Sequence, residues 1–314
     1  MNSTAIAASG LRKAYGDKTI LDGIDITVGT GTIFSLLGPN GAGKTTTVNV
    51  LTTLLKADGG TARVAGHDLV TETEAVRKAI GVTGQFAAVD DLLTGEENLK
   101  LMADLHRLRG KAGKRVVTEL LERFDLVESA RKPAASYSGG MRRKLDLAMT
   151  LVTKPEIVFL DEPTTGLDPR SRRTMWEIVR ELTADGVTIF LTTQYLEEAD
   201  QLADRIAVLD QGRIVAEGTA DELKRRVPGS HVQLRFTDAT ELAAAARILP
   251  GATPDDETLA LRVPGDGSSK SLRALLDRLA AHSLEADQVS IHTPDLDDVF
   301  LALTGHATTE AEPR

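Results

Sequence analysis

The sequence predicts an α/β fold with an inserted helical region and a small α+β domain at the carboxyl end. The first indication is a buried-type strand at 32–37, followed by a glycine-rich loop and by apolar residues with helical spacing from Val48. The second is the segment at about 90–155, where strand signals vanish and helical spacing takes over. The third is the pair Pro228-Gly229, which stops a helix and marks a domain boundary.

Each remaining element follows from its apolar pattern. Alternation at Ile24, Ile26 and Val28 predicts a strand, and the sequence Asp210-Gln211-Gly212 predicts a hairpin turn. Within the inserted region, the expected apolar helix faces carry Leu99, Met102, Leu105, Val116, Leu120, Leu121 and Phe124. The other strands expected before the boundary lie at 157–160, 187–192, 205–209 and 213–216, with a helix at 220–226.

Two domains are therefore expected, at 1–228 and at 229–305. The second shows alternating strands at 232–236, 259–263 and 288–292, with helices near 240–249, 272–281 and 296–303, in the order βαβαβα. It contains no cluster of catalytic type, so we expect an accessory domain that supports dimerisation. The polar segment 306–314 is expected to be a disordered tail.

Composition excludes several classes of protein. The chain of 314 residues has a formal net charge of −9, whereas a nucleic-acid binder usually shows a basic excess, so no nucleic-acid partner is expected. It has no cysteine, which excludes disulfides and thiolate metal sites. Its amino-terminal residues lack the signal-peptide pattern. No apolar run approaches the ~20 residues of a spanning helix, so transport would require a second polypeptide.

A phosphate-binding loop is expected between the strand at 32–37 and the helix that follows. Its glycines let backbone N–H groups curl around phosphate oxygens, and the helix start adds partial positive charge. Lys44 would supply a full charge to the β and γ phosphates, and the hydroxyl of Thr45 suits Mg²⁺. A chance glycine turn and a dinucleotide site fit the context less well, because no G-x-G-x-x-G occurs there. The loop consists of Gly38, Pro39, Asn40, Gly41, Ala42, Gly43, Lys44 and Thr45, with Thr46 next to it.

Two carboxylates end the apolar strand at 157–160. Residues that handle ligands lie at the carboxyl ends of strands in such sheets. Asp161 would hold Mg²⁺, and Glu162 would orient and polarise a water molecule that attacks the γ-phosphate. A solvated acidic turn is the alternative, and the phosphate loop makes it the weaker one.

A third motif identifies a family. Tyr137-Ser138-Gly139-Gly140-Met141 resembles the signature loop of ABC transporter ATP-binding subunits, and it lies between the phosphate loop and Asp161 as in that family. The resemblance covers about residues 6–222. It implies a P-loop NTPase core of ABC type with an antiparallel β subdomain and an inserted helical subdomain. It also implies a polytopic membrane permease as partner, a location at the cytoplasmic face of the membrane, and a second copy.

The resemblance also assigns roles to single residues. In the family, the signature loop touches the γ-phosphate of ATP held by the other copy, which gives this role to Ser138, Gly139 and Gly140. Tyr15 would stack on adenine, or it is a strand-edge tyrosine. The remaining matches are Gln85 (a sensor of Mg²⁺ and of the permease), Asp168 (in the loop that crosses between copies) and Gln194 (at the γ-phosphate).

Two residues depart from the family pattern. Met141 replaces the usual glutamine of the signature, and Gln194 stands where most relatives carry histidine. A glutamine can still exchange hydrogen bonds with the γ-phosphate but cannot become charged, so we predict that hydrolysis is retained but slow.

Short runs at 194–200 and 296–300 are similar to the daunorubicin/doxorubicin-resistance branch, whose members serve antibiotic exporters. The branch implies ATP-driven export of a hydrophobic small molecule. A soluble ABC ATPase, or a nucleotide-gated drug-binding module, is the alternative. The apolar residues at 86–89 and 92–93 fit a permease-docking patch and a subdomain core equally well.

Overall fold

The computed structural model describes residues 3–85, 87–226, 231–265, 268–292 and 294–305. The chain forms two compact units, residues 1–220 and 221–314, and each is described by itself. The predicted boundary at Pro228-Gly229, the predicted tail at 306–314 and Phe86 of the predicted docking patch lie outside the described residues.

The first unit is built around a six-stranded sheet in the order β10-β9-β3-β8-β7-β6. Strands β3, β6, β7, β8 and β9 run parallel to their neighbours, and β10 forms the predicted antiparallel hairpin with β9. Its turn carries Gln211 and Gly212, both with positive φ. The strands are β3 (Ile33–Leu37), β6 (Ile80–Thr83), β7 (Ile157–Asp161), β8 (Thr188–Thr193), β9 (Arg205–Asp210) and β10 (Arg213–Gly218).

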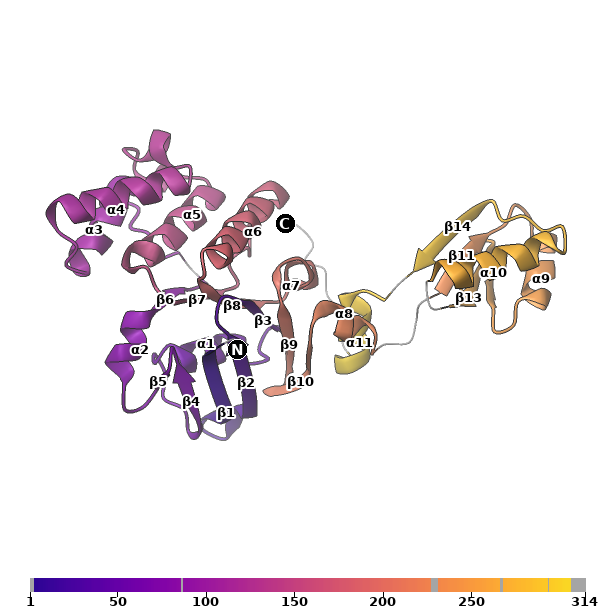
Figure 1. The fold of residues 1–314 in the computed structure, drawn as a ribbon, viewed down its shortest axis with the longest axis horizontal. Coiled ribbons are helices and arrows are strands. Elements are labelled where there is room, and N and C mark those ends of the chain that lie inside the picture. Colours follow the sequence, from indigo (N-terminus) through magenta and orange to yellow (C-terminus); the bar gives the residue numbers. More distant parts are fainter. Residues whose placement is uncertain (1–2, 86, 227–230, 266–267, 293, 306–314) are drawn as a thin grey trace. The chain divides into compact units, whose positions relative to one another are not determined.

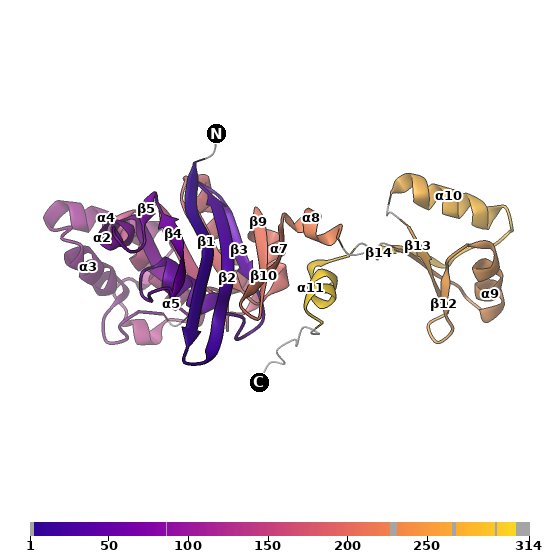
Figure 2. The same cartoon turned by 90° about the horizontal axis from the view of Figure 1, so that it is seen from below.

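A second, antiparallel sheet in the order β2-β1-β4-β5 is the predicted antiparallel subdomain. Figure 2 shows its two long strands, β1 and β2, side by side. Gly60 is required here, because a Cβ at this position would lie 2.4 Å from the carbonyl oxygen of Gly10. The strands are β1 (Thr4–Tyr15), β2 (Lys18–Gly29), β4 (Gly59–Val64) and β5 (His67–Asp68).

The central strands are apolar on both faces, as buried parallel strands require. Successive residues of β7 alternate between two cores: Ile157 and Phe159 pack with the antiparallel sheet, and Val158 and Leu160 pack with the helices. In the first core, Phe190 lies 5.3 Å from Phe159 between ring centroids. The sheet is therefore held rigidly from both sides, which fixes the loops at its edge.

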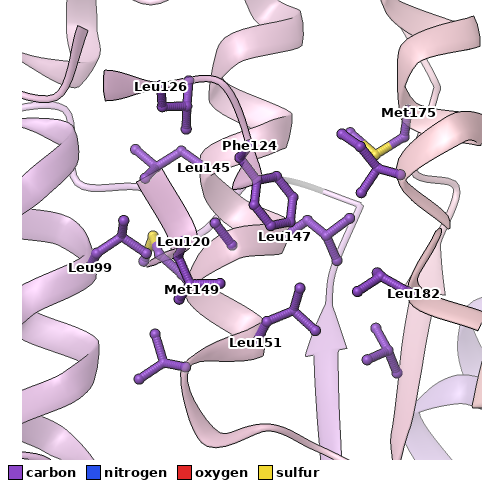
Figure 3. Packing of buried hydrophobic residues seen from close by; sticks show 14 of the residues in the cluster. Leu99, Leu120, Phe124, Leu126, Leu145, Leu147, Met149, Leu151, Met175 and Leu182 are labelled. Carbon is purple, nitrogen blue, oxygen red and sulfur yellow. The ribbon is translucent and has the colours of Figure 1, made fainter. Parts of the chain in front are cut away.

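Helices α3, α4 and α5 form the inserted subdomain (Figure 1). Figure 3 shows Leu99, Leu120, Phe124, Leu145 and Leu147 meeting in its core. The prediction for Leu105 was wrong: this side chain is 67% exposed at the end of α3, where the helix no longer faces the core. The bounds are α3 (Gly95–Leu105), α4 (Gly110–Arg123) and α5 (Gly139–Thr150), with 3₁₀ turns at Val127–Ser129, Ala134–Ser136 and Leu151–Thr153.

Of the predicted docking patch, Val89 is buried in the subdomain core, whereas Leu92 is 90% exposed. Val89 thus belongs to the subdomain core, and contact of the exposed Leu92 with a permease stays a prediction. The other helices that start in this unit are α1 (Lys44–Leu51), α2 (Thr73–Ala79), α6 (Pro169–Ala184), α7 (Leu196–Leu202) and α8 (Ala220–Lys224).

The second unit contains an antiparallel sheet in the order β12-β13-β11-β14. With helices after β11 and β13, this is the βαββαβ arrangement of ferredoxin-like domains. One sheet face, with Val232, Leu234 and Leu261, packs against helices α9 and α10. The sequence analysis missed β12, a short strand that contains Pro254. The bounds are β11 (His231–Arg235), α9 (Ala239–Ile248), β12 (Thr253–Asp255), β13 (Ala260–Pro264), α10 (Ser269–Ala280), β14 (Gln288–His292) and α11 (Leu296–Thr304).

Candidate functional site

Several of the predicted site residues follow four neighbouring strands at one edge of the six-stranded sheet. Because β3, β8, β7 and β6 are parallel neighbours, their carboxyl ends lie side by side. The phosphate loop follows β3, Gln194 follows β8, Glu162 follows β7 and Gln85 follows β6. Residues that are far apart in sequence are thus brought to one edge, where ligands of open α/β sheets bind.

The phosphate loop turns directly into α1. No described side chain caps this helix, and its N-cap residue, Gly43, has φ 113. Gly38 also needs to be glycine, because a Cβ there would lie 2.3 Å from the carbonyl oxygen of Leu209. The start of α1 thus offers backbone donors and the positive end of a helix dipole to an anion.

Lys44 is only 4% exposed and points back along the loop. Its Nζ donates to the carbonyl oxygens of Gly38, at 2.8 Å, and Pro39, at 3.2 Å. It also lies 3.1 Å from Oε1 of Glu162. Lys44, predicted to bind phosphate, and Glu162, predicted to orient the attacking water, therefore neutralise each other's charge in this structure.

The backbone after β7 is tightly held. The Thr192 hydroxyl donates a short hydrogen bond to Oδ1 of Asp161 and accepts one from the amide N–H of Glu162 at 3.1 Å. Glu162 has φ 50, a left-handed conformation that is unfavourable for a residue with a Cβ. Thr165 donates to Oε2 of Glu162 at 3.3 Å. Both carboxylates are buried, so their positions are set by these partners.

The signature loop lies on the surface at the start of α5. Ser138 caps this helix by accepting from the amide N–H of Met141 at 3.3 Å. A Cβ on Gly140 would lie 2.6 Å from Oγ of Ser171, so glycine permits close contact with the start of α6. Ser138 and Gly139 are both exposed.

Asp168 caps α6 beside the signature loop. Its carboxylate accepts from the amide N–H groups of Arg170 and Ser171 and from the Ser171 hydroxyl at 2.6 Å. The Ser171 side chain is the main cause that lowers the pKa of Asp168 below its ordinary value. The carboxylate is exposed and ionised at neutral pH, next to the signature glycines.

Other predicted residues lie at the edges of the site. Tyr15 ends β1 and is 54% exposed, with Lys13 Nζ 5.7 Å from its ring centroid. Thr45 and Gln85 are exposed, and Thr46 and Gln194 are half-buried. Thr192 and Lys44, in contrast, are buried and hydrogen-bonded to neighbouring groups.

Sequence analysis missed a buried polar group behind the carboxylates. Arg143 and Asp146 of α5 are 6% and 3% exposed and form an ion pair of 3.4 Å. Glu198 of α7 is also buried and accepts hydrogen bonds from Thr164 and Trp176. Burial raises the pKa of Glu198 above its ordinary value. The only sequence signal was charge at positions where the helices α5 and α7 face the core.

The residues at this edge fit a nucleotide and Mg²⁺. Mg²⁺ in nucleotide sites is held by one or two carboxylates, hydroxyls and the phosphates themselves. The described residues contain no group of three His, Asp or Glu side chains able to hold a metal alone. A site made of Thr45, Gln85 and Asp161 would therefore need a bound phosphate to complete it.

Comparison with known proteins decides the family. Residues 21–165 match the ABC transporter family. The chain is 52% identical over 307 residues to the daunorubicin resistance ATP-binding protein DrrA3 of Streptomyces coeruleorubidus, covering 97% of both chains. The chain belongs to the ABC transporter family. It is an ATPase of the daunorubicin/doxorubicin-resistance branch, as the runs at 194–200 and 296–300 predicted.

Other relatives agree with this placement. The ABC subunit is 49% identical to the daunorubicin/doxorubicin resistance ATP-binding protein DrrA of Streptomyces peucetius, over 96% of this chain and 93% of the relative. It is 35% identical to the linearmycin resistance ATP-binding protein LnrL of Bacillus subtilis, over 96% of this chain and 98% of the relative.

Solved structures confirm the predicted fold class. An ATP-binding subunit of an ABC transporter superposes with a TM-score of 0.64 at 29% identity, covering 71% of this chain and 92% of that chain. A nucleotide-free ATP-binding cassette gives 0.64 at 28% identity, covering 71% and 94%. Among the described residues, no helix of this ABC subunit is long and apolar enough to span a bilayer.

Proposed function

We propose that this ATPase drives export of a hydrophobic small molecule, an antibiotic or a related drug, through a separate polytopic membrane permease. The similarity of nearly the whole chain to daunorubicin resistance proteins carries the proposal. The subunit would bind the cytoplasmic face of the membrane through the permease. The exposed Leu92, which follows Gln85 in the chain before α3 begins, suits such a contact.

Binding of ATP would use the carboxyl edge of the sheet. The loop from Gly38 to Thr46 surrounds the phosphates, and Tyr15 stacks on adenine. Thr45, Gln85 and Asp161 hold Mg²⁺, which neutralises phosphate charge when bound. The exposed face of Tyr15 and the uncapped start of α1 support this arrangement.

Hydrolysis would depend on three side chains. Lys44 exchanges its partner Glu162 for phosphate oxygens, because an anion with several charges attracts the ammonium group more strongly. Glu162, released from Lys44, accepts a hydrogen bond from the attacking water and orients it. Gln194 donates a hydrogen bond to the γ-phosphate from its position between the two.

Two copies would share each nucleotide. Ser138, Gly139 and Gly140 begin a helix on the surface, so their free donors face an anion outside their own chain. Asp168, beside them, would line the same contact between copies. Residues 1–228 form the ATP-binding domain in this proposal, and residues 229–305 form an accessory domain that supports the dimer.

Phosphate release by Glu162→Gln tests the enzymatic half of the proposal. We expect a loss of about 10²-fold or more in turnover, with ATP binding retained, because glutamine keeps the size but not the negative charge of the side chain. Turnover should also stop when EDTA removes Mg²⁺. Equal rates for wild type and Glu162→Gln would contradict the role of Glu162.

Drug retention in cells tests the transport half. The chain is expressed together with a candidate polytopic membrane permease, and daunorubicin retention is followed by fluorescence. Lys44→Ala is the matched control, because the subunit is still expressed but its ATP turnover is expected to be lost. We expect lower retention with wild type than with Lys44→Ala. Equal retention of daunorubicin and of other antibiotics in both strains would overturn export.

A further inference from the structure

Arg143 lies on α5, the helix that begins at the signature loop. Its buried side chain contacts the backbone of Asp161 and Glu162. Its side chain leaves α5 toward the sheet and is 8% exposed. The guanidinium donates to a series of backbone carbonyl oxygens: Nε to Pro163 at 2.8 Å, Nη2 to Asp161 and Glu162 at 3.2 Å each, and Nη1 to Gly84 at 2.8 Å.

Three of these carbonyls are consecutive and carry Glu162 in their middle. The left-handed φ of 50 at Glu162 aims its carboxylate at Lys44, and such a conformation persists only where its surroundings impose it. Arg143 supplies part of that constraint with a planar group whose N–H directions are fixed. A lysine ammonium has three donors where the guanidinium has five, so it could not donate to these three carbonyls and to that of Gly84 at once.

The same pair of residues also holds both sides of Gln85. Arg143 binds the carbonyl oxygen of Gly84, directly before it. Asp146 accepts a hydrogen bond from the amide N–H of Ala88, beyond it, through Oδ1 at 2.9 Å. The other carboxylate oxygen, Oδ2, faces Arg143 at 3.4 Å. One buried pair, Arg143 and Asp146, thus binds the backbone on both sides of Gln85 (the Gln85 loop) and the backbone at 161–163. We call this pair the anchor.

Burial of the Arg143–Asp146 ion pair costs desolvation free energy. We therefore infer that the pair has a role other than stabilising the fold. Burial lowers the pKa of Arg143 and raises the pKa of Asp146, so desolvation acts against both charges. Buried ion pairs are weak contributors to stability compared with apolar residues of similar volume. What the pair provides is a fixed geometry for four backbone carbonyls and one amide.

We propose that Arg143 and Asp146 act as positioning residues that set the Glu162 carboxylate and couple its position to that of the Gln85 loop. The proposal rests on the proposed role of Glu162 in hydrolysis. A displacement of the loop at Gly84 or Ala88 moves the guanidinium through its hydrogen bonds, and the guanidinium moves the backbone at 161–163.

Turnover of Arg143→Lys in the full chain is the first test. Lysine keeps the charge but not the planar fork, so we expect kcat to fall about tenfold to a hundredfold, as for a misplaced catalytic group. The KM for ATP and the equilibrium affinity for a fluorescent ATP analogue should stay within about twofold, because no nucleotide contact is lost. Arg180→Met is the control: Arg180 also donates to a carbonyl, that of Gln201, on the exposed side of α6, and its loss should leave kcat unchanged.

A double-mutant cycle shows whether Arg143 acts through Glu162. Placed in the Glu162→Gln background, Arg143→Lys should cause no further loss of turnover. An equal fractional loss in both backgrounds would overturn the proposal, as would wild-type kcat in Arg143→Lys alone.

Amide hydrogen exchange tests the coupling without any measurement of activity. Arg143→Lys and Asp146→Ala should each accelerate exchange at both 84–89 and 161–166, whereas Asp146→Asn, which keeps the acceptor for Ala88, should have the smaller effect at 87–89. Unchanged exchange in both segments would overturn the anchor. If Glu162→Gln retains wild-type turnover, the proposed role of Glu162 fails, and the exchange result alone then decides whether the anchor exists.

Discussion

The phosphate loop and the signature loop both lie at helix starts, yet their polar groups are satisfied in opposite ways. Lys44 and Glu162 are buried and hold each other at 3.1 Å, so this half of the site is organised within one chain. Ser138 and Gly139 are exposed at the start of α5, where the Ser138 hydroxyl accepts from the amide N–H of Met141. The difference is what the proposed dimer requires, in which a preorganised half of each site meets a half supplied by another copy.

Removal of the Lys44 ammonium group should reduce ATP turnover more than a change at Gln194 or Tyr15. In Lys44→Ala, ATP turnover should fall by on the order of 10²-fold to 10³-fold, since a buried charge aimed at developing phosphate charge is lost. Phosphate release measured at saturating ATP checks this. The change also leaves Glu162 buried without its cation, so a thermal melt must show that the variant is folded. Full turnover in Lys44→Ala would remove the buried half from the mechanism.

Gln194 is the next residue to test. It is half-buried and follows β8, which lies between β3 and β7, the strands that precede Lys44 and Glu162. Gln194→Ala should lose nearly all activity, about tenfold or more, as expected for one hydrogen bond to a charged group. Gln194→His should show a smaller fall if glutamine is tuned to this site. Turnover numbers for the two variants at one ATP concentration check this, and wild-type activity in Gln194→Ala would exclude a contact with the γ-phosphate.

Tyr15 should show the smallest effect, since it lies on the antiparallel sheet outside both halves. Loss of stacking costs about 0.5–1.5 kcal/mol, so Tyr15→Ala should weaken ATP binding about twofold to tenfold with kcat unchanged. Tyr15→Phe keeps the ring and serves as the control. Equal affinity in Tyr15→Ala and wild type would leave Tyr15 as a strand-edge residue.

Local patterns made much of this molecule predictable. The strand, loop and helix around Lys44 and the strand before Asp161 are contiguous in sequence, so their apolar periodicity revealed them. The order of the parallel strands then placed Gln85 and Gln194 at the same edge.

Long-range pairing explains what sequence analysis missed. Arg143 reaches the carbonyl of Gly84, which is 59 residues away in sequence, and no local pattern specifies such a contact. The hydrogen bond from the Thr192 hydroxyl to Asp161 also joins two strands that are distant in sequence, so no local pattern predicted it. In the second unit, β12 contains Pro254 and spans only Thr253–Asp255, too short for a period to be seen.

Mixing two inactive variants tests most directly whether the two halves meet across chains. Lys44→Ala lacks the buried half, and Ser138→Arg blocks the exposed half with a bulky side chain. In a mixed dimer, one site combines both defects, while the other pairs an intact Lys44 with an intact Ser138. We predict that mixing the two purified proteins restores a substantial fraction of wild-type phosphate release. No activity above the sum of the separate proteins, although the mixed dimer is detected by cross-linking, would contradict the account.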